Sequence, residues 1–206
     1  MDRPDEREEE ELAELQERSL EGTPPPGWRP AQETVEAVEQ PGEAVSPEEG
    51  YAIRGDAGDV GQLGEAFERL ESAEAGHSIV GAIREHSTTT QFGPTRDDAV
   101  AQYDSERNEI TIHEDLRDAS PEVLAAHLAH EGTHVQWNEP DSIDQEYHAF
   151  KAEDEVWREI KGNQSDSQCD WVSALMARGE ADAKVELRRL EPYRDLPDHW
   201  PPDRRE

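Results

Sequence analysis

The residues best suited to chemistry are His130, Glu131 and His134, which lie within the string His130-Glu131-Gly132-Thr133-His134. Histidines four positions apart share one face of an α-helix, so their imidazoles can bind a single metal ion. A glutamate between them is placed to accept a proton from a water molecule that the metal activates. The spacing therefore predicts a Zn²⁺ site with His130 and His134 as ligands and Glu131 as general base.

The segment that carries this string has the marks of an amphipathic helix from residue 121 to about residue 137. Ser120 suits the N-cap, Pro121 suits the first helical position, and Glu122 lies in the first turn, where the helix dipole favours a negative charge. The apolar residues of the segment fall on one face, beside the face that carries the histidines. These apolar residues are Leu124, Leu128 and Val135.

A second helix is expected after the break at Pro140, from Ser142 to about Lys161. Ser142 precedes Gln145 by three positions, which is the spacing of a capping box. The apolar residues of this segment recur at helical spacing. They are Ile143, Tyr147, Phe150, Trp157 and Ile160.

A catalytic zinc ion usually has three protein ligands, so a third ligand is expected close to the two histidines. If the two helices run antiparallel, Glu146 lies level with His134. Glu153 lies about 10 Å deeper along the helix axis, level with His127. We therefore predict Glu146 as the third metal ligand and place Glu153 away from the reacting water.

Other polar residues leave alternatives open. His127 shares the ligand face one turn below His130, and we expect it to hydrogen-bond either a neighbouring strand or Glu153; a supporting role and direct ligation are the alternatives. His148 is expected to face solvent. For the donor that would stabilise the oxyanion, the sequence does not choose among Tyr103, Tyr147 and His148.

Gly132 and Thr133 are small, which would let the edge of a β-sheet approach the metal closely. An extended peptide could pair with such an edge and present its carbonyl group to the metal.

The chain before the motif predicts two helices followed by a small sheet. Helical spacing covers residues 63–70 and 79–83, while residues 88–92, 99–103 and 109–113 favour strands. Residues 104–108 are turn-forming, so the last two strands should form a hairpin. Residues 171–190 predict further helix. The expected fold class is α+β, with a short antiparallel or mixed sheet packed on the helix of the motif and on a second, glutamate-bearing helix.

Composition separates this domain from its flanking segments. Residues 1–58 are rich in Glu and Pro and predict a disordered acidic tail. Residues 59–197 form the expected domain, and residues 198–206 a C-terminal tail. The formal net charge of −31 argues against nucleic acid or an anionic membrane as partner. The single cysteine, Cys169, excludes an internal disulfide, and with no secretory signal in view we expect a cytoplasmic protein.

The sequence resembles the zincin metallopeptidases, in the branch whose third zinc ligand is glutamate, and a compact group of uncharacterised bacterial members in particular. Three stretches, which span the sheet and the two helices over about residues 63–161, carry the resemblance. They are Asn108-Glu109-Ile110-Thr111-Ile112, Pro121-Glu122-Val123-Leu124-Ala125-Ala126-His127-Leu128-Ala129-His130-Glu131-Gly132-Thr133-His134 and Gln145-Glu146-Tyr147-His148-Ala149-Phe150.

The chain departs from larger zincin groups at three points. The interval from His134 to Glu146 is shorter than in thermolysin-like enzymes. Phe150 stands where those enzymes carry an aspartate that supports a ligand histidine, and Pro140 stands where metzincins carry their third histidine. The resemblance therefore implies a zinc peptidase fold without identifying the substrate.

Three functions are consistent with these residues. The leading hypothesis is a zinc-dependent metallopeptidase that acts on a peptide or protein substrate. The alternatives are a non-catalytic, zinc-stabilised binding module that keeps the fold, and an acidic interaction protein in which the motif is coincidental. The oligomeric state is not determined by the sequence.

Overall fold

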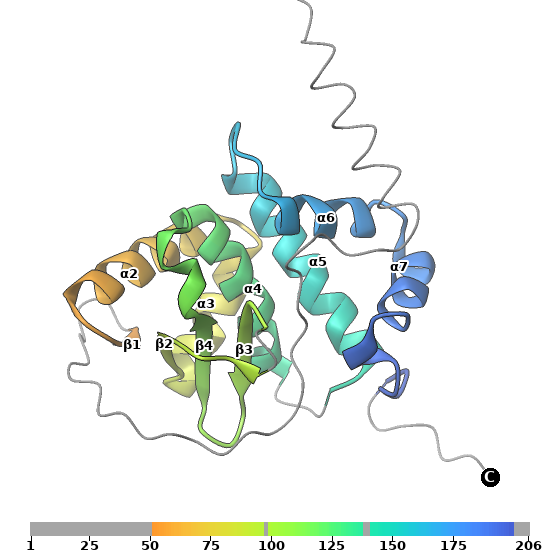
Figure 1. Cartoon of the computed structure of the whole chain (residues 1–206), viewed down its shortest axis with the longest axis horizontal. Coiled ribbons are helices and arrows are strands. Elements are labelled where there is room, and N and C mark those ends of the chain that lie inside the picture. Colours follow the sequence, from red (N-terminus) through yellow and green to blue (C-terminus); the bar gives the residue numbers. More distant parts are fainter. Residues whose placement is uncertain (1–50, 97–98, 138–140, 200–206) are drawn as a thin grey trace, which may run out of the picture.

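The computed structural model describes residues 51–96, 99–137 and 141–199 and has an α+β fold with a four-stranded mixed sheet (Figure 1). In chain order the elements are β1 (Ala52–Arg54), α2 (Ala57–Ser72), α3 (Gly76–His86), β2 (Thr89–Gly93), β3 (Ala101–Asp104), β4 (Glu109–His113), a 3-10 helix (Glu114–Asp118), α4 (Pro121–Trp137), α5 (Ile143–Ile160), α6 (Ser167–Met176), α7 (Glu180–Leu187) and a 3-10 helix (Glu191–Tyr193).

The sheet has the strand order β1-β2-β4-β3. The predicted hairpin is confirmed, because β3 pairs antiparallel with β4 and Ala101 lies opposite Ile112. Of the two expected arrangements, antiparallel and mixed, the sheet has the mixed one, because β1, β2 and β4 are parallel to one another. Alternation of apolar and polar residues within a strand indicates that one face is buried, but it does not identify the neighbouring strand.

The described structure begins before the expected domain boundary at residue 59. Ile53 of β1 is buried, and Asp56 caps α2 by accepting hydrogen bonds from the amides of Gly58 and Asp59 at 2.8 and 3.0 Å. A three-residue strand is too short to show a periodicity, so composition alone misplaced this boundary. Residues 1–50 of the tail predicted for residues 1–58 lie outside the described residues.

Helix α4 lies at the centre of the domain, in contact with α2, α3, α5 and the strands β3 and β4 (Figure 1). Its bounds agree with the prediction, and the hydroxyl of Ser120 accepts a hydrogen bond from the amide of Val123 at 3.3 Å. At Gly132 an added Cβ would lie 2.3 Å from Ile79 Cγ2 of α3. Gly132 therefore permits close packing of α3 on α4 and not the approach of a sheet edge that we expected.

Helix α5 packs on the opposite side of α4 from the sheet and is itself covered by α6 and α7 (Figure 1). Ser142 caps α5 as predicted, accepting a hydrogen bond from the amide of Gln145 at 3.2 Å. The C-terminal segment returns to this end of α5, where the amide of Asp144 donates to the carbonyl of Asp198 at 3.0 Å. Asp198 therefore belongs to the folded domain and not to the expected tail.

Among the described residues no helix combines the length and apolarity needed to cross a membrane.

Candidate metal centre

The structure brings together the side chains of His130, His134 and Glu146. Nε2 of His130 lies 3.6 Å from Oε2 of Glu146, and Nε2 of His134 lies 3.7 Å from Oε1 of the same carboxylate. One ligand atom from each of the three residues lies within 4.8 Å of the others. The antiparallel packing of α4 on α5 therefore places Glu146 level with the two imidazoles, as we predicted for two antiparallel helices.

These separations suit a divalent cation. In a tetrahedral zinc site with bonds of 2.0–2.2 Å, neighbouring ligand atoms lie about 3.4 Å apart. Oε2 of Glu146 is buried and has no hydrogen-bond partner among the described residues, although Nε2 of His130 faces it. A buried carboxylate oxygen without a hydrogen bond destabilises the folded protein, and a cation between these atoms would coordinate it. Two nitrogens and one oxygen form a donor set that zinc accepts.

The charges around this cluster favour ionised carboxylates. Burial by itself raises the pKa of Glu146, but the neighbouring His134, His130 and Tyr193 lower it below its usual value. Burial lowers the pKa of His130, but the carboxylates of Glu146 and Glu153 raise it well above its usual value. A proton on His130 therefore competes with a metal ion, so metal binding must displace it.

Glu131 differs from Glu146 and Glu153, because its pKa is raised. Burial is the main cause, and the charges of Glu146 and Glu153 add to it, while His130 and His134 act in the opposite direction. A carboxylate whose pKa is shifted toward neutrality is a better proton acceptor near neutral pH. Its environment therefore suits the predicted role of general base.

Glu153 supports the cluster from the other side. Its Oε2 accepts a hydrogen bond from Nδ1 of His130 at 3.1 Å, and its Oε1 lies 3.3 Å from Nδ1 of His127. A proton on Nδ1 of His130 leaves the Nε2 lone pair of the neutral ring available for a metal. Glu153 thus positions His130. His127 contacts Glu153, which is one of the two partners that the sequence analysis expected for it.

No family model matches the chain, and neither the curated proteins nor the solved structures gave a match.

Tyr193 is a residue of this site that sequence reasoning missed. Its ring packs edge-on against Phe150, with 6.0 Å between the centroids, and the ring of Phe150 in turn lies 4.5 Å from that of His130. Burial raises the pKa of Tyr193 well above its usual value, and the charges of Glu146 and Glu131 raise it further. Its hydroxyl is therefore a neutral hydrogen-bond donor beside the cluster. Nothing in the sequence distinguishes it, because it lies in a proline-flanked segment that contains no motif.

The three expected oxyanion donors have other contacts. The hydroxyl of Tyr103 donates to Asn108 at 3.4 Å within the hairpin. His148 is half-buried, and its ring packs at a tilt against that of Trp137 with 4.9 Å between the centroids. Tyr147 packs among the residues that connect α5 with α7, beneath the ammonium group of Lys184.

Thr133, which we expected to border an approaching sheet edge, is buried, and its hydroxyl donates to the carbonyl of Ala129 at 2.8 Å. It therefore belongs to the interior of the helix packing and not to a substrate groove.

Proposed function

We propose that this protein is a zinc-dependent metallopeptidase of the zincin type, with His130, His134 and Glu146 as the protein ligands of the metal. The observation that carries the proposal is the convergence of two imidazole nitrogens and the buried carboxylate of Glu146 at separations close to those of a tetrahedral zinc site. The resemblance of the sequence to glutamate-ligand zincins supports the same assignment.

A zinc ion at this place would polarise a peptide carbonyl and lower the pKa of a water molecule. Glu131 would accept the proton of that water and pass it to the nitrogen of the departing amine, a role for which its raised pKa is suited. Tyr193, kept neutral by burial and by the surrounding carboxylates, would donate a hydrogen bond to the carbonyl oxygen as negative charge develops there.

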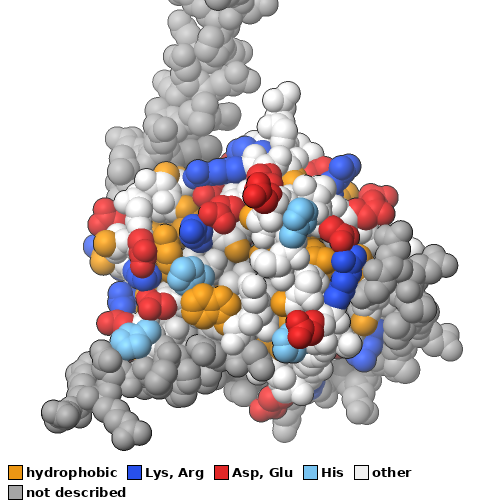
Figure 2. All heavy atoms as spheres, turned by 180° about the vertical axis from the view of Figure 1, so that it is seen from behind, with side chains coloured by type: hydrophobic (Ala, Val, Ile, Leu, Met, Phe, Trp, Pro, Cys, Tyr) orange, Lys and Arg blue, Asp and Glu red, His pale blue; other side chains and the backbone are white. Residues whose placement is uncertain are grey.

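The edge strand β3 is the element on which we propose that an extended peptide binds, because α4 contacts it and its outer side lacks a neighbouring strand in the described sheet. The net charge of −31 would favour neutral or cationic substrates. Acidic side chains are interspersed with Lys and Arg on the face shown in Figure 2, so the excess negative charge does not form one uniform patch there. A cytoplasmic location remains a prediction.

The decisive test is a comparison of wild type with Glu131→Gln in zinc content and in cleavage of a peptide library. We expect the variant to keep its zinc and to lose at least about a hundredfold in cleavage rate, because the amide cannot accept a proton. Glu155→Gln, an exposed position on α5, is the matched control and should behave as wild type. If zinc-loaded wild type and Glu131→Gln are equally inactive, the site is a non-catalytic zinc module.

Elemental analysis of His134→Ala and Glu146→Ala tests the ligands separately from catalysis. Both variants should lose zinc, whereas His77→Ala, at an exposed histidine of α3, should retain it. Purified wild type without zinc after expression with ample metal would mean that the motif is coincidental.

A further inference from the structure

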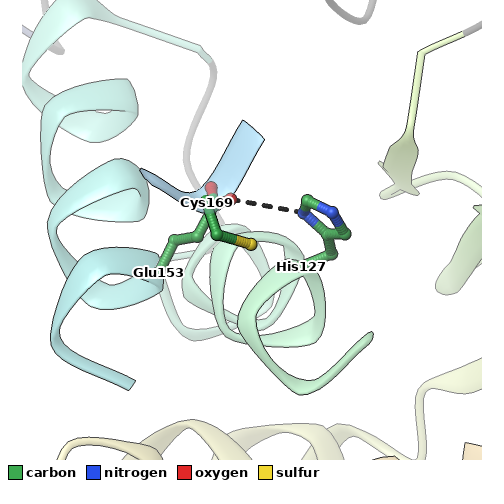
Figure 3. Close-up of side chains that lie close together, drawn as sticks. All are labelled: His127, Glu153 and Cys169. Carbon is green, nitrogen blue, oxygen red and sulfur yellow. Dashed lines mark ion pairs between the residues drawn. The ribbon is translucent and has the colours of Figure 1, made fainter. Parts of the chain in front are cut away.

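A second group of potential metal ligands lies behind the first, where α4, α5 and α6 meet. It consists of His127, Glu153 and Cys169, whose exposed fractions are 3%, 2% and 0%. One ligand atom from each lies within 4.8 Å of the others. Figure 3 shows the side chains of Glu153 and Cys169 close to the imidazole of His127, each from a different helix.

One oxygen in this group has an ion-pair contact but no hydrogen bond. Oε2 of Glu153 accepts the hydrogen bond from His130, but Oε1 is buried and has no hydrogen-bond partner among the described residues. Nδ1 of His127 lies 3.3 Å from Oε1 without completing a hydrogen bond. A cation held between this oxygen, the imidazole nitrogen and the thiol sulfur would coordinate all three buried donor atoms.

The donor set differs from that of the first site, because it contains sulfur. Glu153 supplies a carboxylate oxygen, His127 an imidazole nitrogen and Cys169 a thiol sulfur. Burial raises the pKa of the Cys169 thiol, which is therefore protonated until a metal displaces its proton to solvent. One carboxylate and one thiolate would neutralise a divalent cation, which suits a site with no access to water.

The surroundings suit a closed site. Cys169 packs with Val123, Ala126 and Trp157 in a small apolar cluster. An apolar wall excludes water that would otherwise compete for the donor atoms.

We propose that His127, Glu153 and Cys169 bind a second divalent ion of the zinc class through nitrogen, oxygen and sulfur, and that this ion joins α4, α5 and α6. This site does not depend on the proposed peptidase activity. The two sites share Glu153, because the carboxylate that would bind the buried ion through Oε1 also positions His130 through Oε2.

Cobalt substitution of the full-length protein tests this proposal directly. A thiolate bound to Co²⁺ produces intense near-ultraviolet charge-transfer absorption, whereas the first site has only nitrogen and oxygen donors and produces none. The chain contains a single cysteine, so such absorption can come only from Cys169. We expect metal-free, reduced wild type to bind about two cobalt ions per chain and to develop this band.

Two variants assign the ions. Cys169→Ser should lose the charge-transfer band and bind one cobalt ion fewer, while His134→Ala should keep the band and lose the other ion. The exposed His77→Ala should behave as wild type. Thermal melting of each metal-free variant reports whether it is folded. If Cys169→Ser does not fold, the wild-type spectrum still shows whether Cys169 binds cobalt.

Wild type that binds cobalt without the charge-transfer band, whether one ion or two, would overturn the second site and leave Glu153 as a support for His130 only. Because the measurement reads metal binding and not cleavage, that result would not affect the proposed peptidase function. Conversely, absence of peptidase activity would not affect the proposed second site, because the thiolate–cobalt band does not depend on cleavage.

Discussion

Glu153 Oε2 lies 3.1 Å from Nδ1 of His130, while the opposite nitrogen of the same ring faces Glu146. Thermolysin-like enzymes support a ligand histidine with an aspartate four positions after the ligand glutamate, and here that position is Phe150. The apolar ring of Phe150 packs edge-on against His130 instead. The hydrogen bond that orients the histidine therefore comes from Glu153, almost one turn further along α5.

Replacing Glu153 should weaken metal binding at the first site. Glu153→Gln keeps the shape of the side chain but removes the charge that holds a proton on Nδ1 of His130, so we expect a loss of about 10- to 100-fold in zinc affinity. The affinity is measured by competition with a chelator in a Cys169→Ser background, which removes the proposed second site. Glu155→Gln is the matched control, and an unchanged affinity in Glu153→Gln would show that His130 needs no such support.

Tyr193→Phe should impair catalysis without releasing the metal. If the hydroxyl of Tyr193 stabilises the developing negative charge, its removal should lower kcat by about 100- to 1000-fold with little change in KM. Tyr147→Phe, at a half-buried tyrosine of α5, is the control. Loss of zinc together with activity in Tyr193→Phe would indicate that the hydroxyl serves only to position Glu146.

The stability of the metal-free protein should depend on the ionisation of Glu153. Contacts with His127 and His130 lower the pKa of Glu153 from 4.5 to about 2 in the folded protein, against the effect of burial. Because the folded pKa is the lower one, ionised Glu153 stabilises the fold above about pH 4.5, and this contribution is lost as the pH falls toward 2.

Urea unfolding of metal-free wild type and Glu153→Gln across this pH range checks the prediction. As the pH falls, the free energy of unfolding should decrease more steeply for wild type than for Glu153→Gln, because the amide side chain of the variant cannot take up a proton. Parallel curves for the two proteins would contradict the shifted pKa.

Gly132→Ala should destabilise the domain by about 1–3 kcal/mol, because the new methyl group would overpack the contact of α4 with α3. Its Cβ would lie 2.3 Å from Ile79 Cγ2 and 2.9 Å from Ile83 Cδ1. Gly81→Ala is the matched control within a helix: no atom lies within 4 Å of its added Cβ, so it should leave stability unchanged or raise it by about 0.5–1 kcal/mol. Equal melting temperatures for the two variants would contradict the close packing.

Local chemistry was sufficient to predict the helices that carry the site. The caps at Ser120 and Ser142 act within one helical turn, and the hairpin of β3 and β4 depends on a short turn, so neighbouring residues determine both features. The level of Glu146 relative to His134 could also be predicted, because two antiparallel helices joined by a short connection place equidistant residues side by side.

The tertiary structure alone decided which distant groups complete the site. Tyr193 reaches the cluster through the C-terminal segment, and Cys169 approaches Glu153 from α6, although no local pattern connects either residue with the motif. The parallel pairing of β2 with β4 and the packing of Gly132 on α3 are likewise unspecified by periodicity. Periodicity indicates that a face is buried, but the partner that buries it is chosen by the packing of the whole chain.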